Sequence, residues 1–124
     1  MTNPFRDQEK FMKACDQSVD DYDFSQYAMY LKLIDEEVAE LKTAVENNDD
    51  VEQLDALIDI IVVTIGAIHS MGADAEGAWK EVMSTNFAKI DKETGRVRKR
   101  EDGKVLKPTG WHPPVLGMYT TKKK

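Results

Sequence analysis

The run IIVVTIGAIHSM, residues 60–71, constrains the fold more than any other part of the chain. It is apolar on nearly every side of a helix, and a helix of this kind is buried all round. A chain of 124 residues supplies only a small bundle, which seldom covers such a helix by itself. We therefore expect a second copy of the chain to complete the cover, giving a homodimer or a higher oligomer.

Apolar periodicity predicts four helices, over residues 6–16, 24–46, 51–71 and 75–90. Ser25 is the expected N-cap of the second helix, and Gly72 is the expected stop of the third. Trp79 and Phe87 fall on the apolar face of the fourth helix and are expected in the core. Beyond it, prolines and an Asp102-Gly103 pair favour a hairpin-like turn over a helix. The predicted fold is all-α: a four-helix-type bundle completed by dimerisation, with a short irregular or hairpin-like basic tail.

Composition and charge suggest how the chain is organised. We expect a single domain, with a helical body at residues 6–91 and a basic tail at residues 92–124. Residues up to Asp91 include 20 acids and 7 bases, whereas the later residues include 3 acids and 10 bases. A single cysteine fits a reducing compartment, and the longest apolar run is too short to span a bilayer. The expected location is the cytoplasm, without membrane contact.

Acidic residues lie at matching positions on the second and third predicted helices. Glu37 and Glu40 share one edge of the second helix, and Asp55 and Asp59 share a stripe of the third. Folding the pair back about residues 47–50 sets Glu37 level with Asp59, and Glu40 level with Asp55. Carboxylates gathered in this way cannot all ionise unless a cation compensates them. Oxygen ligands alone favour Mg²⁺, or Mn²⁺, as that cation.

This interpretation has a plain alternative, because acids at helical spacing usually face water. Glu52 also lies on the stripe that carries Asp55 and Asp59, so the choice of ligands on the third helix stays open. In favour of a metal site, Asp59 begins the most apolar stretch of the chain, where an uncompensated carboxylate is costly.

Several residues outside the acidic stripes are candidates for binding a substrate. Asn86 and Lys89 are three apart and share one helix face, where they could also be an ordinary surface pair. Lys104 and Lys107 bracket the end of the Asp-Gly turn and could bind phosphate as point charges, or simply aid solubility. Gln17, in the segment after the first helix, could read the edge of a base.

The acids belong to segments that resemble a known family. Glu36-Glu37-Val38-Ala39-Glu40 within LIDEEVAEL, together with LDALIDIIVVTIGAIHSMG, NFAKID and DGKVLKP, resemble the all-α nucleoside triphosphate pyrophosphohydrolases. These form the MazG-like superfamily, and the similarity is to its phosphoribosyl-ATP pyrophosphohydrolase-like members, over about residues 8–115. The resemblance implies a Mg²⁺-dependent, oligomeric enzyme. Its expected reaction is hydrolysis of a nucleoside triphosphate, or a phosphoribosyl-ATP-like nucleotide, to the monophosphate and pyrophosphate by water attack at the α-phosphorus.

The resemblance also assigns roles to residues of the acidic stripes. Glu37 and Glu40 match the metal-binding acids of the family's EExxE motif, and Asp59 matches the last residue of its ExxD motif. The chain departs from that pattern at Ala56, where the family has Glu. Asp55, next to it and on the same face, is the preferred replacement.

Other roles implied by the resemblance are less closely tied to a motif. Glu52 with Asp55 is an alternative ExxD pair. Glu36 is the candidate for holding or deprotonating the attacking water. Asn86 and Lys89 match residues that would touch a substrate phosphate or ribose. The base and sugar of the nucleotide are not identified, and dUTP, other deoxynucleotides, damaged nucleotides and phosphoribosyl-ATP all remain open.

Two functions of other classes are alternatives to the enzyme. One is a helical dimer that binds nucleic acid or a partner through the basic run RVRKR. No aromatic residue interleaves that run to stack bases and the body is acidic, so we do not expect nucleic acid as a partner. The other is a bundle that binds a divalent cation without turnover.

Overall fold

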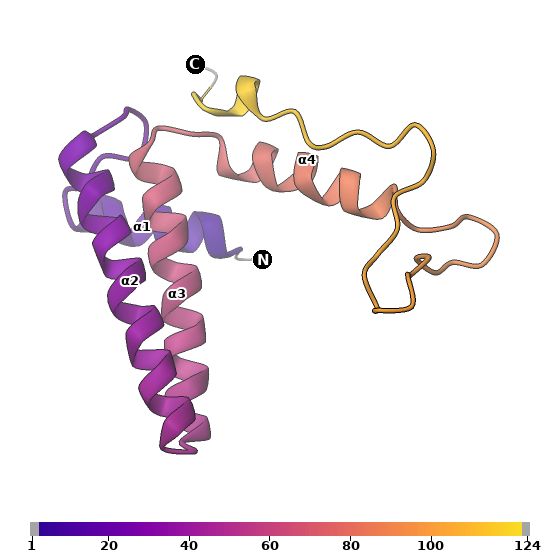
Figure 1. Ribbon diagram of the computed structural model, residues 1–124. Helices are drawn as coiled ribbons and strands as arrows, with labels where there is room; N and C mark the ends of the chain where they lie inside the picture. The colour runs from indigo at the N-terminus through magenta and orange to yellow at the C-terminus, as the bar shows by residue number, and fades with distance from the viewer. Residues whose placement is uncertain (1–2, 123–124) are drawn as a thin grey trace. The chain divides into compact units, whose positions relative to one another are not determined.

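The computed structural model describes residues 3–122, and within them all regular structure is helical. The elements are α1 (Pro4–Ala14), α2 (Phe24–Glu46), α3 (Asp50–Ser70), α4 (Ala75–Phe87) and a short 3-10 helix, η1 (Gly117–Tyr119) (Figure 1). The predicted all-α class is confirmed for this part of the chain. No single helix in it is long and apolar enough to cross a bilayer. The bent pair of α3 and α4 would be long and apolar enough, judged by length and composition alone.

Contacts divide the chain into two compact units. Unit 1 runs to Ala75 and takes in the chain again from Thr120, whereas unit 2 is Glu76–Tyr119. The two are described separately below. One domain with a tail from residue 92 stays a prediction, as does completion of a bundle by dimerisation.

Each helix of unit 1 begins on a side chain that caps its first turn. The side chains of Asn3, Asp23 and Asp49 accept hydrogen bonds of 2.8, 3.0 and 3.1 Å from the backbone amide three residues further on. Such caps satisfy amides that have no partner within the helix. The expectation that Ser25 caps α2 is therefore wrong, because the helix already begins at Phe24 and Asp23 takes this role.

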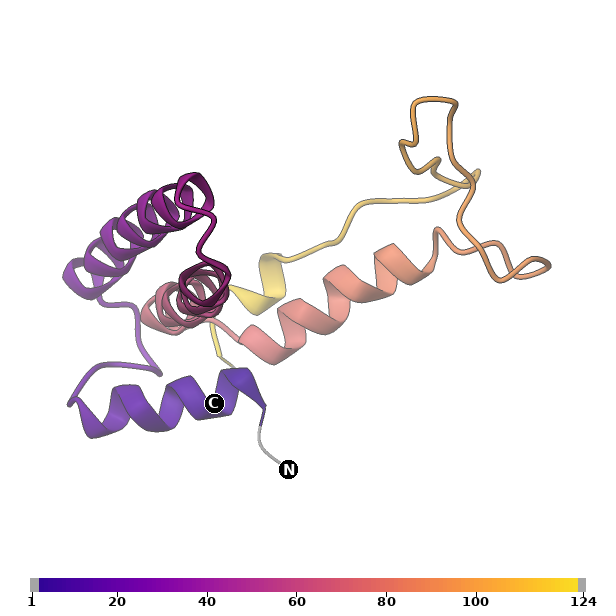
Figure 2. The same cartoon turned by 90° about the horizontal axis from the view of Figure 1, so that it is seen from below.

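The helices α2 and α3 form a hairpin and run side by side (Figures 1 and 2). Asn48, in the turn between them, has a φ of 51°, a left-handed conformation that Asn tolerates. Near the other end, the ring of Tyr30 lies against Gly66, where an added Cβ would come within 2.7 Å of three ring atoms. Glycine at position 66 thus lets the aromatic ring pack directly on the backbone of α3.

The core of unit 1 forms where α1 runs across this hairpin (Figure 2). Its buried members are Met12 of α1, Val19 of the following segment, Tyr30 of α2 and Ala67 of α3. The expectation of all-round burial for residues 60–71 is only partly met, since Ile61 is 50% exposed while Ile65 is buried.

The exposed apolar side chains of α3 continue toward its N-terminus at spacings of three and four residues. We call this set the α3 stripe; it consists of Val51, Leu54, Ile58 and Ile61. All four are at least half exposed in the single chain.

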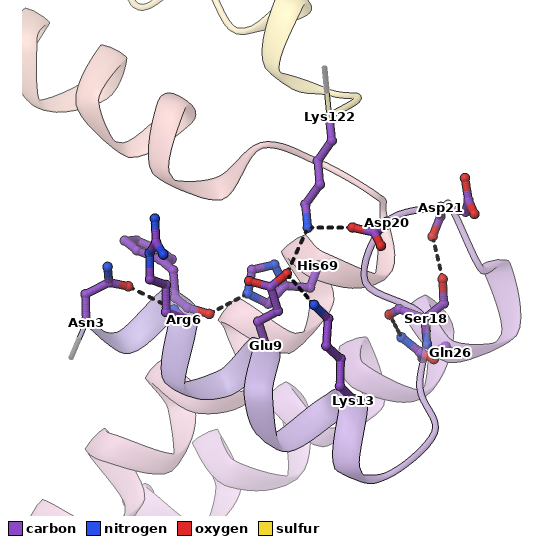
Figure 3. A network of polar contacts seen from close by, with 11 residues as sticks. Asn3, Arg6, Glu9, Lys13, Ser18, Asp20, Asp21, Gln26, His69 and Lys122 are labelled. Atoms are coloured by element: carbon purple, nitrogen blue, oxygen red, sulfur yellow. Dashed lines mark hydrogen bonds and ion pairs between the residues drawn. The ribbon is translucent and has the colours of Figure 1, made fainter. Parts of the chain in front are cut away.

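A polar network joins Lys122 to the helical part of unit 1 (Figure 3). The ammonium of Lys122 lies 3.5 Å from a Glu9 oxygen and 3.3 Å from an Asp20 oxygen, and its backbone amide donates to the Gly72 carbonyl at 2.9 Å. Nearby, the ring Nε2 of the buried His69 is 2.8 Å from the Phe5 carbonyl. This histidine thus has a structural hydrogen bond, as a histidine on an apolar helix usually does.

Unit 2 consists of α4 followed by irregular chain. The helix ends at Phe87, three residues earlier than predicted, and antiparallel bridges join Ile90 to Val97 and Lys99 to Val105. The second bridge flanks Asp102-Gly103, where a hairpin-like turn is expected and Gly103 has a φ of 87°. Trp79 and Phe87 are 57% and 59% exposed, so their expected place in the core is wrong for the single chain. The reason is that the described part of unit 2 has no second α-helix for α4 to pack on.

Candidate functional site

Glu37 and Glu40 of α2 and Asp55 and Asp59 of α3 influence one another electrostatically. Burial raises the pKa of the Glu37 carboxyl, and the charges of Glu40, Asp59 and Asp55 raise it further. A hydrogen bond with the Glu40 carboxyl acts in the same direction, because a shared proton favours the neutral form. The hairpin therefore gathers the four carboxylates into one cluster, which we call the acidic cluster.

The pKa of Asp59 is raised for the same physical reasons. Burial is the largest cause, followed by the charges of Asp55 and Glu40 and by a hydrogen bond with the Asp55 carboxyl. Two half-buried carboxyls, one on each helix, thus have a raised pKa because burial and, after it, the neighbouring acids disfavour their charged forms. Either protons or a cation must offset the repulsion within such a cluster.

The Glu37 carboxyl is the part of the acidic cluster that a cation would satisfy best. Its Oε2 is buried and has no hydrogen-bond partner among the described residues. An orphaned carboxylate oxygen is expensive unless a positive ligand reaches it. No three Asp, Glu, His or Cys side chains between residues 3 and 122 already form a ligating group.

The buried position of Ala56 bears on the choice of ligands from α3. Ala56 is only 3% exposed, and the charges that crowd Glu37 come from Asp55 and Asp59. Glu52 lines a cavity of about 330 Å³ beside the turn of the hairpin, which it shares with Glu40 of the acidic cluster. Asp55 with Asp59, rather than Glu52, stays the predicted set of companions of Glu37.

Two further predicted residues lie in unit 1. Glu36 is exposed on α2, one residue before Glu37. The side-chain oxygen of Gln17 accepts a hydrogen bond of 2.5 Å from the Tyr30 hydroxyl. This oxygen therefore helps to fix the core aromatic ring of α2.

Unit 2 contains a pocket of about 510 Å³, formed by the irregular chain that follows α4. Its charged lining consists of one acid and four bases: Asp91, Lys89, Lys92, Arg98 and Lys107. We call it the basic pocket. Positive charge in a concave site attracts anionic ligands.

Asp91 organises one wall of the basic pocket. Its carboxylate accepts hydrogen bonds from the backbone amides of Glu93 and Thr94, at 2.8 and 3.4 Å. Arg98 pairs with the same carboxylate at 3.4 Å. The hydrogen bond from the Glu93 backbone amide is the main reason that the pKa of Asp91 is lowered. The acid is thus ionised and already engaged by Arg98.

Trp111 connects the two predicted lysines of the basic pocket. The ammonium of Lys89 lies 5.0 Å from the centroid of the Trp111 ring, and that of Lys107 lies 4.7 Å from it. The indole N–H donates to the Thr85 carbonyl at 2.7 Å, which fixes the ring on α4. Lys89 also donates to the side-chain oxygen of Asn86 at 3.3 Å.

The sequence analysis identified only part of this pocket. It singled out Lys89 and Lys107 but missed Lys92 and Arg98 of the lining, and it missed Trp111, which contacts the two lysines. The predicted Lys104 is exposed, and its backbone amide donates to the Asp102 side chain at 3.0 Å. A tryptophan close after two lysines was the available signal, since an aromatic ring attracts cations.

Comparison with known families bears on the acidic cluster. A family model described as phosphoribosyl-ATP pyrophosphohydrolase matches residues 8–86, which is more than half of the chain. The chain belongs to this family. Phosphoribosyl-ATP pyrophosphohydrolases are part of the MazG-like all-α superfamily and generally depend on a divalent metal. No individual curated protein matches the chain significantly.

The extent of the match separates the two candidate sites. It includes the whole acidic cluster and Asn86, and it ends before Lys89, Lys104 and Lys107. Membership in the family therefore implies a pyrophosphohydrolase, whereas the basic pocket has to be interpreted from its own geometry.

Proposed function

We propose that the chain is a Mg²⁺-dependent pyrophosphohydrolase acting on a nucleoside triphosphate or a phosphoribosyl-ATP-like nucleotide. The products are the nucleoside monophosphate, or its equivalent, and pyrophosphate. The observation that carries the proposal is the orphaned Oε2 of Glu37, buried among three further carboxylates in a member of this family. An acidic cluster would repel a phosphate chain, so a cation is needed to bring the two together.

Glu37, Glu40, Asp55 and Asp59 are the residues that would hold the metal, with Mn²⁺ as a possible substitute for Mg²⁺. When bound, the divalent ion supplies positive charge that offsets the substrate phosphates and acidifies water. The same charge would relieve the repulsion that raises the pKa of Glu37 and Asp59.

The remaining proposed steps belong to side chains of the protein. Glu36 accepts a proton from the attacking water as a general base. The water oxygen bonds to the α-phosphorus, the bond from that phosphorus to the bridging oxygen breaks, and pyrophosphate leaves. Gln17 contacts the base through its amide nitrogen. The residues proposed to bind the rest of the substrate are Asn86, Lys89, Lys104 and Lys107.

The α3 stripe supports the proposal that the protein is a homodimer. Four large apolar side chains in a row, all at least half exposed, resemble a helix seam that a second copy covers. Burying them would also meet the expectation that the apolar half of α3 needs cover.

A pyrophosphate-release assay tests the proposed activity. The panel contains dUTP, the other deoxynucleotides, oxidised nucleotides and phosphoribosyl-ATP, each with Mg²⁺ and with excess chelator. We expect release that disappears in chelator and returns with Mg²⁺ or Mn²⁺. In Glu40→Gln, kcat/KM should fall by about a hundredfold or more, as when other electrostatic groups are removed.

Glu46→Gln is the matched control, since it removes an exposed carboxylate from the same helix outside the acidic cluster. Its activity should equal that of the wild type. Full activity in chelator, or a wild-type rate in Glu40→Gln, would overturn the proposed role of the cluster.

A further inference from the structure

Two lysines from different segments of unit 2 converge on one aromatic ring. Lys89 follows α4 by two residues, and Lys107 comes after the turn at Asp102-Gly103. Both ammonium groups lie at or within 5.0 Å of the Trp111 centroid, so about 10 Å at most separates them. Both lysines also line the basic pocket.

The Trp111 ring offsets the repulsion between the ammonium groups of Lys89 and Lys107. Like charges at such a separation repel, whereas the negative face of an indole attracts each of them. The hydrogen bond from the indole N–H to the Thr85 carbonyl holds the ring in place on α4. Removing the ring would leave two flexible lysine side chains with no common anchor, and these would separate.

The other charges of the basic pocket leave its net charge positive. Asp91 is its only acidic lining residue, and Arg98 already pairs with it. An anion entering the pocket therefore meets the ammonium groups of Lys89, Lys107 and Lys92 without a competing carboxylate.

We propose that Trp111 is a positioning residue that gathers Lys89 and Lys107 on the wall of the basic pocket to bind an oligophosphate group. A chain of phosphates offers anionic oxygens to more than one ammonium at once, which a single carboxylate cannot do. The inference rests on the proposed function for the source of that group, the phosphate chain of the nucleotide. A nucleic-acid strand is the less suitable occupant, because the indole that could stack on a base is already engaged by two lysines.

The binding test uses metal-free protein, so that the acidic cluster does not contribute. In a Trp79→Phe background, Trp111 is the only tryptophan, and its fluorescence reports directly on the site. Titration with tripolyphosphate in chelator should give a saturable change. The affinity should fall about tenfold or more in Lys89→Gln and in Lys107→Gln, and remain unchanged in Lys99→Gln. The last variant is the matched control, because Lys99 belongs to the same segment but does not line the basic pocket.

Variants of Trp111 separate positioning from a general structural role. Calorimetry with tripolyphosphate should show about a tenfold loss of affinity for Trp111→Leu and a smaller loss for Trp111→Phe, which keeps an aromatic face. In the hydrolysis assay, Trp111→Leu should raise KM more than it lowers kcat. Equal losses in the two variants, or a fall in kcat alone, would overturn the positioning role.

The outcomes also distinguish this inference from the proposed function. Glu40→Gln should lower kcat/KM for hydrolysis by about a hundredfold or more and leave tripolyphosphate binding intact. Binding that depends on Trp111 in a protein that hydrolyses no nucleotide would support this site and refute the enzyme. Hydrolysis with normal kinetics in Trp111→Leu would refute this site alone. Equal loss in Lys99→Gln and Lys107→Gln, or stronger competition by a single-stranded oligonucleotide, would show a non-specific or nucleic-acid surface instead.

Discussion

Glu37 is a residue whose surroundings work against its own ionised form. It is half-buried, one of its oxygens has no partner in the described chain, and three other acids raise its pKa. A protein that only needed stability would not keep this arrangement, because apolar or polar neutral residues would cost less. The local cost at Glu37 and Asp59 therefore supports the proposed role of these residues in binding a cation.

Asp59→Asn should remove activity without destabilising the metal-free protein. Deleting one of several crowded carboxylates relieves repulsion, so the melting temperature in chelator should equal or exceed that of the wild type. The apparent Mg²⁺ requirement for any residual activity should rise. Asp35→Asn, an exposed position on α2, is the control and should change neither quantity. A much lower melting temperature in Asp59→Asn would instead make Asp59 a structural hydrogen-bonding group.

The pKa of Glu9 is shifted in the opposite direction from those of Glu37 and Asp59, so Glu9 contributes to stability when it is ionised. Burial tends to raise its pKa, but the charges of Lys122 and Lys13, a hydrogen bond from Lys13 and the charge of His69 together lower it from its usual 4.5. A carboxyl with a lowered pKa stabilises the fold above its unfolded pKa, and this stabilisation is lost as the pH falls through the folded pKa.

Lys122→Met should accordingly destabilise the protein at pH 7 by at most about 1 kcal/mol, since the ion pair is near the surface and screened. The difference from the wild type should shrink as the pH falls below about 4.5, where Glu9 gains its proton. Urea unfolding at several pH values measures it. A difference that is constant across this range would show that packing of the lysine stem, not charge, is responsible.

At the scale of elements, helix existence and spacing were predictable, whereas several ends were not. Periodicity located α1, α2, α3 and α4 to within about three residues. The cap of α2 was missed because Asp23 and Ser25 are both good capping residues, and only the backbone geometry decides between them. The end of α4 was overestimated because Ile90 continues the apolar spacing after the helix has stopped.

The two candidate sites differ in how far sequence could predict them. The acidic cluster follows from two periodic helices and a short turn, so pairing by distance from the turn was enough to bring its residues together. The basic pocket lies in irregular chain, where no period relates Lys89, Lys107 and Trp111. A contact between side chains in such a segment depends on the tertiary path of the backbone, which charge and composition do not specify.

Gly66 tests the close packing of α2 on α3. Gly66→Ala would gain about 1 kcal/mol from helix propensity, but its methyl group would overlap the Tyr30 ring, at a cost of about 1–3 kcal/mol. We expect net destabilisation in urea unfolding. Gly117→Ala is the control, since nothing lies within 4 Å of the position of its Cβ. In a Tyr30→Ala background the penalty of Gly66→Ala should disappear; if it persists, the ring is not its cause.

At the scale of the whole molecule, the α3 stripe is a row of large apolar side chains that the single chain leaves exposed to solvent. Light scattering at micromolar concentration should show a dimer or a larger assembly. Ile58→Glu places a charge in the stripe at a side chain that is 52% exposed, so it should dissociate the assembly without unfolding the chain. Phe11→Glu changes a similarly exposed apolar residue on α1; it is the control and should leave assembly unchanged. A wild-type monomer would contradict the proposed homodimer.

Because the backbone amide of Lys122 is hydrogen-bonded to the Gly72 carbonyl, unit 2 is inserted between two neighbouring points of unit 1. The chain leaves unit 1 shortly after Gly72 and rejoins it next to the same residue, so residues 76–119 form an excursion whose two ends start from neighbouring points. The entropy of closing such a loop depends only weakly on its length; doubling it costs only about 0.6 kcal/mol. The excursion can therefore lengthen, shorten or exchange its basic residues during evolution while the helical hairpin and its carboxylates stay as they are. The proposed oligophosphate site can in this way change separately from the part of the chain that holds the acids.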